Sequence, residues 1–275
     1  MLSVNTNSGA LIALQNLNAT NMSLEQTQNR INTGLKVAGP KDNAAVYQIA
    51  QGLRADLSGM DAVKQSLDRA SSTVDIAIAG GQSVSDLLNQ MRAKAVAASD
   101  SGLDAASRAA LNNDFNALRD QITTIVNNAS FNGTNMLNAS GGSVSAIVSP
   151  DGSSSLTVTA IDLTLGGANI GVTASTSLGT TYTTAQSVLT DIDTSIAAVN
   201  AALGKLGTGA NAIENQRTFA NKLSDTIQTG IGNLVDADLA KESANLQALQ
   251  VKQQLGVQAL SIANQAPQVL LSLFR

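Results

Sequence analysis

The chain has 275 residues and a formal net charge of −4, with 13% charged and 2% aromatic residues. It contains no Cys and no His, which excludes thiolate and imidazole catalysis, a Ser-His-Asp triad and the usual zinc, haem and iron–sulfur sites. Mild acidity argues against nucleic-acid binding, and no apolar run approaches the roughly 18 residues of a membrane span. We therefore expect no cofactor, no nucleic-acid partner and no membrane insertion. The N-terminus also lacks the features of a cleavable signal peptide, so we expect a cytosolic chain or one exported without cleavage.

The first zone, residues 1–137, has the periodicity of helices. Apolar and amide side chains recur in steps of three and four over 14–35, which places them on one helical stripe. Gly39-Pro40 ends this run, and a longer one follows over 46–98. The pair Gly80-Gly81 within it predicts an end or a bend. A third run covers 111–129.

The middle zone, residues 138–183, is rich in Ser, Thr and Gly. Alternating residues over 144–148 and 156–160 flank Ser149-Pro150-Asp151-Gly152, which predicts a β-hairpin. A short β-like segment follows at 170–174. The hydroxyl side chains of this zone are candidate sites of O-glycosylation, with an unmodified solvated face as the alternative. These candidates are Ser143, Ser145, Thr157 and Thr159.

The last zone, residues 184–275, is again helical in pattern. Apolar residues line one face over 188–206, and Gly207-Thr208-Gly209 predicts a break before the next helix. Residues 207–212 match the loose dinucleotide pattern G-x-G-x-x-A, but they follow a helix rather than a strand. We interpret them as a turn between helices. A final periodic run covers 235–273.

The apolar stripes at the two ends of the chain need partners, because long helices with narrow stripes cannot bury themselves alone. The partners would be each other, or the same stripes of neighbouring chains. We therefore predict an assembly interface at the apolar positions of these stripes. They are Leu11, Leu14, Leu17, Leu24, Ile31, Leu255, Ile262, Val269, Leu270 and Leu273.

Pairs of acidic residues in the last zone give little support for a metal site. In Asp191/Asp193 and in Asp236/Asp238 the two side chains diverge by about 200° on a helix. Asp238 and Glu242 share a face, and we interpret them as the acidic start of a helix. Since no catalytic constellation is present, we predict that the protein is not an enzyme.

Several motifs occur in order along both helical zones. In the first zone they are residues 30–37 (RINTGLKV), 41–45 (KDNAA) and 130–137 (SFNGTNML). In the last zone they are residues 233–243 (NLVDADLAKES), 258–267 (QALSIANQAP) and 271–275 (LSLFR). Together they resemble the signature segments of the bacterial flagellins, and the short middle zone is similar to the short type found in alphaproteobacteria.

This resemblance implies a mainly α fold, with long terminal coiled-coil helices, an α-helical bundle and a small mid-chain β-hairpin region. Residues 1–44 and 235–275 would pair in the core of a filament and be unfolded in the free subunit. Residues 45–137 and 184–234 would form a helical shell, and residues 138–183 would face outward as a hairpin and loop region.

The resemblance also implies function and partners. The chain would be exported unfolded by the flagellar type III apparatus and self-assemble outside the cell into the flagellar filament, the helical propeller for swimming motility. Its partners would be copies of itself, related flagellins, an export chaperone, and hook-associated and cap proteins. The alternative is a hook–filament junction adaptor, which shares the terminal patterns.

Residues 88–96 are similar to the flagellin segment that a Toll-like innate receptor recognises. Arg92 matches that segment, whereas Gln90 and Lys94 stand where the family has Arg and Leu. We therefore expect a degenerate receptor segment here.

Overall fold

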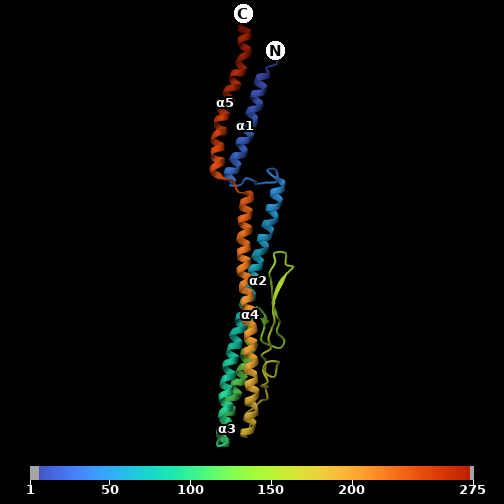
Figure 1. Ribbon diagram of the computed structural model, residues 1–275, viewed down its shortest axis with the longest axis vertical. Coiled ribbons are helices and arrows are strands. Elements are labelled where there is room, and N and C mark those ends of the chain that lie inside the picture. Colours follow the sequence, from blue (N-terminus) through green and yellow to red (C-terminus); the bar gives the residue numbers. More distant parts are fainter. Residues whose placement is uncertain (1–5, 273–275) are drawn as a thin grey trace. The chain divides into compact units, whose positions relative to one another are not determined.

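The computed structural model describes residues 6–272 and the surroundings of side chains up to Gln265. These residues form five helices and two antiparallel two-stranded sheets (Figure 1). The elements in chain order are α1 (Ser8–Thr33), α2 (Ala44–Ala98), α3 (Ala105–Asn128), β1 (Ser130–Phe131), β2 (Thr134–Asn135), β3 (Val144–Ile147), β4 (Ser155–Val158), α4 (Tyr182–Val235) and α5 (Leu239–Ser272). The predicted fold, mainly α with paired terminal helices and small hairpins in mid-chain, is confirmed.

The chain divides into two compact units. The first combines the described residues up to Ala55 with those from Thr226 onward, and the second spans Asp56–Asp225. Helices α2 and α4 contribute residues to both units.

In the first unit, the connections that follow α1 and precede α5 are hydrogen-bonded to each other. The backbone N–H of Lys36 donates to the Val235 carbonyl at 2.7 Å, and that of Ala237 donates to the Gly34 carbonyl at 2.9 Å. Gly34 ends α1 with φ +71°, the left-handed conformation that favours glycine at a helix C-terminus. Asp238 Oδ1 accepts from the N–H groups of Ala240 and Lys241, both at 3.1 Å, so it caps α5 as a helix start.

The second unit has a continuous apolar core. Helix α2 supplies Met60, Leu67 and Leu88, each at most 1% exposed, and α3 supplies Phe115 and Ile122, both fully buried. Polar side chains join the helices at the edge of this core. Lys64 Nζ of α2 donates to Ser224 Oγ of α4 at 3.1 Å. The periodic residues of the sequence therefore form the core of this unit.

The predicted helix end at Gly80-Gly81 and the predicted break at Gly207-Thr208-Gly209 are wrong, because α2 and α4 run through them. A Cβ on Gly80 would lie 2.8 Å from Leu137 Cδ1, and one on Gly209 would lie 2.6 Å from Val158 Cγ1. These glycines permit close packing rather than a turn. A long, packed helix tolerates the cost of about 1 kcal/mol that each glycine carries relative to Ala.

The middle zone contains the predicted hairpin. Strands β3 and β4 pair antiparallel, with Ser145 opposite Thr157 and Ala146 opposite Leu156. The helical zone expected up to residue 137 ends at Asn128. A second hairpin, β1–β2, follows it and was not predicted. The two turn residues of this hairpin are Asn132 at φ +49° and Gly133 at φ +80°, as a two-residue Asn-Gly hairpin turn requires. The β-like segment predicted at 170–174 forms no strand.

Candidate assembly surface

Helices α1 and α5 form an antiparallel pair in the first unit (Figure 1). Three side-chain contacts fix this direction, because residue numbers rise along α1 as they fall along α5. Asn7 Nδ2 donates to the Ala263 carbonyl at 2.6 Å. Gln253 Nε2 donates to Asn21 Oδ1 at 2.8 Å, and Arg30 Nη1 donates to Glu242 Oε1 at 3.3 Å.

The less exposed residues of both helices define the seam of this pair, in steps of three and four as in a coiled coil. On α1 they are Ala10, Ala13, Leu17, Thr20, Leu24, Thr27, Arg30 and Ile31. On α5 they are Glu242, Leu246, Leu249, Gln253, Gly256, Leu260 and Ala263. Many of these side chains are small or polar. A Cβ on Gly256 would lie 3.2 Å from Leu17 Cδ1, so the two helices approach closely at this point.

Apolar side chains also lie outside the seam. Leu11 is 59% exposed, Leu255 60% and Ile262 65%. Other large apolar side chains of the pair are exposed as well, namely Ile12, Leu14, Met22, Leu239, Val251 and Val257. Exposed apolar surface of this extent is typical of a site of protein–protein contact.

The structure divides the predicted interface residues between these two surfaces. Leu17, Leu24 and Ile31 lie in the seam, whereas Leu11, Leu14, Leu255 and Ile262 lie outside it. Val269 and Leu270 belong to α5, but their side chains lie outside the described part of the chain, and Leu273 lies outside the described residues.

Sequence reasoning missed the small and polar half of the seam. Ala13 and Thr20 carry no strong apolar signal. Glu242 was interpreted with Asp238 as the acidic start of a helix, and it does lie in the first turn of α5. The step of four from Glu242 to Leu246 places it on the periodic face of that helix, but the contact of its side chain, 11% exposed, with Arg30 was not predicted.

The predicted receptor-like segment lies in α2 and is engaged within the second unit. Arg92 Nε donates to Asp193 Oδ1 at 2.5 Å, and this hydrogen bond and the attraction of the carboxylate raise the pKa of Arg92. Lys94 Nζ lies 2.7 Å from Asp114 Oδ2, and Gln90 is exposed. The two cations therefore link α2 to α4 and α3.

The four candidate glycosylation residues are exposed. Ser145 and Thr157 are opposite each other in the β3–β4 register, and Thr157 Oγ1 lies 3.3 Å from Ser145 Oγ. Ser143 Oγ accepts from the Ala160 N–H at 3.1 Å. The alternate positions Ala146 and Val158 are buried, so the hydroxyl groups belong to the solvent face of the hairpin.

The described residues contain neither a candidate metal site nor a candidate membrane span. Within residues 6–272, no three acidic side chains are grouped so that they could hold a metal ion. None of the helices in this part of the chain is long and apolar enough to cross a membrane.

An antiparallel pair of terminal helices with uncovered apolar side chains defines a structural subunit that packs against other chains. Residues 4–141 match the bacterial flagellin N-terminal helical region, and residues 189–274 match the bacterial flagellin C-terminal helical region. The chain belongs to the bacterial flagellin family.

Full-length relatives agree with this assignment. The chain is 52% identical over 273 residues to flagellin FljM of Caulobacter vibrioides, covering 99% of this chain and 98% of the relative. It is 36% identical over 286 residues to a flagellin of Brucella melitensis, covering both chains fully. Among solved structures, a putative flagellar hook-associated protein from Vibrio parahaemolyticus matches 71% of this chain and all of its own, with a TM-score of 0.59 and 13% identity.

The family assignment confirms the predicted resemblance and function. Flagellins are the structural, non-enzymatic subunits of the extracellular flagellar filament that drives swimming. The adaptor alternative is not retained, because the likeness to the hook-associated protein at 13% identity shows a shared fold alone.

Proposed function

We propose that the outward apolar side chains of α1 and α5 are the contacts through which identical subunits pack in the filament. In this arrangement residues 1–44 and 235–275 form the filament core. Residues 45–137 and 184–234 form the shell, and residues 138–183 face outward. Contacts between different faces of identical subunits produce a fibre when the rotation from one subunit to the next does not close a ring.

The observation that carries this proposal is the exposure of Leu255 and Ile262. They are seven residues, about two turns, apart on α5, while the seam of the same helix already contacts α1. Burying a Leu or Ile side chain contributes about 1.5–3 kcal/mol. Several such side chains per subunit, buried together, would offset the entropy that the subunits lose on association.

The test is to assemble purified subunits carrying Ile262→Asp. We expect no filaments in electron micrographs, because the new carboxylate would have to be desolvated at the subunit contact. The matched control is Ser261→Asp, which adds the same charge at the exposed neighbouring position that lies off the apolar stripe. Normal filaments from Ile262→Asp would overturn the proposal.

We propose that an export chaperone, hook-associated proteins and cap proteins bind the same exposed side chains. An export chaperone would cover the apolar face of α5 before assembly, and hook-associated and cap proteins would present complementary faces at the filament ends. Exposed Leu255 and Ile262 support this, since an uncovered apolar face invites aggregation. Pull-down of the chaperone by wild type but not by a Leu255→Asp, Ile262→Asp double variant would agree, and equal capture would contradict it.

We propose that Ser143, Ser145, Thr157 and Thr159 are the glycosylation sites of the filament. Their exposure on the hairpin surface supports this, because a transferase must reach the hydroxyl group. Mass spectrometry of filaments sheared from cells tests it. Unmodified peptides covering all four residues would overturn it.

For the receptor-like segment, we propose weak recognition. The Arg92 guanidinium is engaged by Asp193, and a charged Lys94 stands at the apolar position. A receptor-reporter assay that compares wild type with a Gln90→Arg, Lys94→Leu double variant should show a stronger response to the variant. Equal responses would contradict the proposal.

A further inference from the structure

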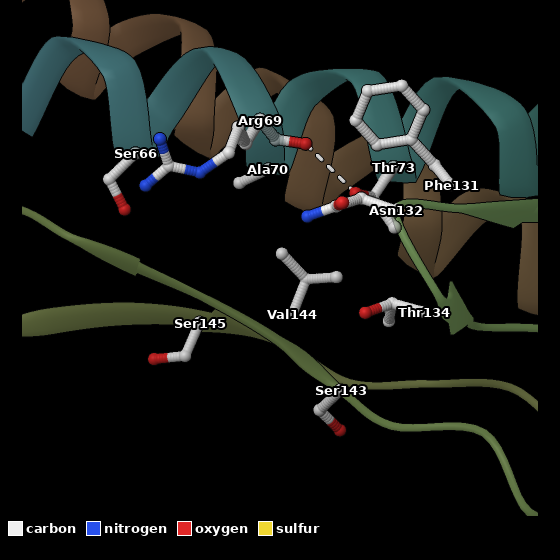
Figure 2. A pocket seen from close by; sticks show the side chains of 10 residues that line it. All are labelled: Ser66, Arg69, Ala70, Thr73, Phe131, Asn132, Thr134, Ser143, Val144 and Ser145. Carbon is white, nitrogen blue, oxygen red and sulfur yellow. Dashed lines mark hydrogen bonds between the residues drawn. The ribbon is translucent and has the colours of Figure 1, made fainter.

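A polar cavity of about 210 Å³ lies in the second unit, between α2, the β1–β2 turn and β3. Figure 2 shows Asn132 and Thr134 reaching into this space, above the strand that carries Val144, while Arg69 extends from α2 beside Ser66. Arg69 is the one charged residue of its lining, and the lining holds no acidic residue.

Three hydrogen-bond donors of this cavity are unused within the described residues. The guanidinium of Arg69, the amide of Asn132 and the hydroxyl of Thr134 form no hydrogen bond or ion pair there. Arg92, Arg119 and Arg217, by contrast, each contact an Asp carboxylate. A cavity that holds a cation and free neutral donors, with no acid in its lining, is suited to hold an oxyanion.

We infer that this cavity, here named the Arg69 pocket, binds a carboxylate that a second copy of the chain supplies as an Asp or Glu side chain. The inference rests on the proposed self-assembly. The volume of the Arg69 pocket admits one side-chain group or a small acid. The chain has 20 acidic and 16 basic residues, and the exposed carboxylates of Asp56, Asp86 and Asp191 form no ion pair in the described residues.

Filament assembly of full-length chains tests the inference. Arg69→Gln keeps a polar side chain but loses the charge, so we expect the critical concentration for assembly to rise about fivefold to tenfold. This difference should shrink at high salt, which screens a partly exposed ion pair. The critical concentration of Arg69→Lys should lie between those of wild type and Arg69→Gln, because an ammonium keeps the charge but lacks the planar pair of donors of a guanidinium.

Arg217→Gln is the matched control. It removes the same charge from the second unit, but from an arginine that Asp68 and Glu214 of its own chain already engage. We expect its critical concentration to stay within about twofold of wild type, as for a surface ion pair. Circular dichroism of each free subunit verifies that the helices are intact.

Two results would overturn the inference. One is equal critical concentrations for wild type and Arg69→Gln. The other is saturable, Arg69-dependent binding of acetate, seen as a shift of the Arg69 Nε–H resonance, at concentrations that leave the critical concentration of wild type unchanged, because the pocket would then take its carboxylate from solution rather than from a second copy. Failure of the self-assembly proposal is a separate result, because only normal filaments from Ile262→Asp would show it.

Discussion

At the scale of single residues, Asn135 closes the junction between α3 and the β1–β2 hairpin. It is 8% exposed. Its Nδ2 donates to the carbonyls of Val126 at 2.7 Å and Asn127 at 3.3 Å, and its Oδ1 accepts from the N–H groups of Leu137 at 2.8 Å and Asn138 at 3.2 Å. One side-chain amide thus satisfies backbone groups at the end of α3 and in the segment that follows β2.

We expect Asn135→Ala to lower the free energy of unfolding by about 3 kcal/mol, because buried backbone donors and acceptors lose their partner. Urea denaturation followed by circular dichroism measures the change. Asn127→Ala is the control, since the Asn127 side chain is exposed near the end of α3 and its loss should change stability by less than about 0.5 kcal/mol. Similar losses in both variants would show that Asn135 has no special role.

Arg108 has a comparable role at the end of α2. It is 4% exposed, and its guanidinium donates to the carbonyls of Ala98, of Asp100 at 3.0 Å and of Leu103 at 3.2 Å. The carbonyls at a helix C-terminus lack intrahelical partners and attract a cation. We expect Arg108→Ala to cost about 2–4 kcal/mol of stability. Arg108→Lys should recover part of it, since one ammonium cannot reach three carbonyls; full recovery in thermal denaturation would contradict this account.

At the scale of elements, two glycines that lie two residues apart have opposite roles in α4. A Cβ on Gly209 would clash with Val158 of β4, whereas a Cβ on Gly207 would meet nothing within 4 Å. We therefore expect Gly207→Ala to raise stability by about 0.5–1 kcal/mol through lower chain entropy and better helix propensity. Gly209→Ala should lower it by about 1–3 kcal/mol, because the hairpin must shift. Thermal unfolding of both variants decides the matter, and a change of the same sign in both would refute the packing explanation.

The sequence predicts the existence of these elements better than their ends and contacts. Apolar periodicity averaged over many turns identified all the long helices, since it is the property that packing selects. It could not show that Gly80 and Gly209 permit close approach, because that depends on Leu137 and Val158, far along the chain. The Asn132-Gly133 signal for the missed hairpin was available in the sequence.

For the assembly surface, the limit of sequence reasoning has a different cause. An apolar stripe combines the side chains that a helix buries within its own chain with those that it offers to others. Leu17 and Leu24 belong to the first group and Leu11 and Leu14 to the second. Hydrophobicity alone cannot separate them, and the seam itself uses residues such as Thr20 that give no apolar signal.

At the scale of the whole molecule, the two units differ in what stabilises them. The second has a core of fully buried side chains such as Phe115, Leu67 and Ile122. The first unit contains the α1–α5 pair, whose seam includes Thr20, Gly256 and other small or polar residues. A helix pair of this kind buries little apolar area, and most helical stability comes from packing. We therefore expect the terminal helices to depend on other subunits for their stability.

We accordingly expect α1 and α5 to open far more readily than the second unit in the free subunit. Hydrogen exchange measured by mass spectrometry should show amides of α1 exchanging at least about 100-fold faster than those of α2 around Leu67. In the filament this difference should largely vanish, because the proposed subunit contacts would cover Leu255 and Ile262. The Ile262→Asp subunit gives the comparison, since it should show the fast exchange under all conditions. Strong protection of α1 in the free wild-type subunit would mean that the seam alone stabilises the pair, and the outward apolar side chains would then need another explanation.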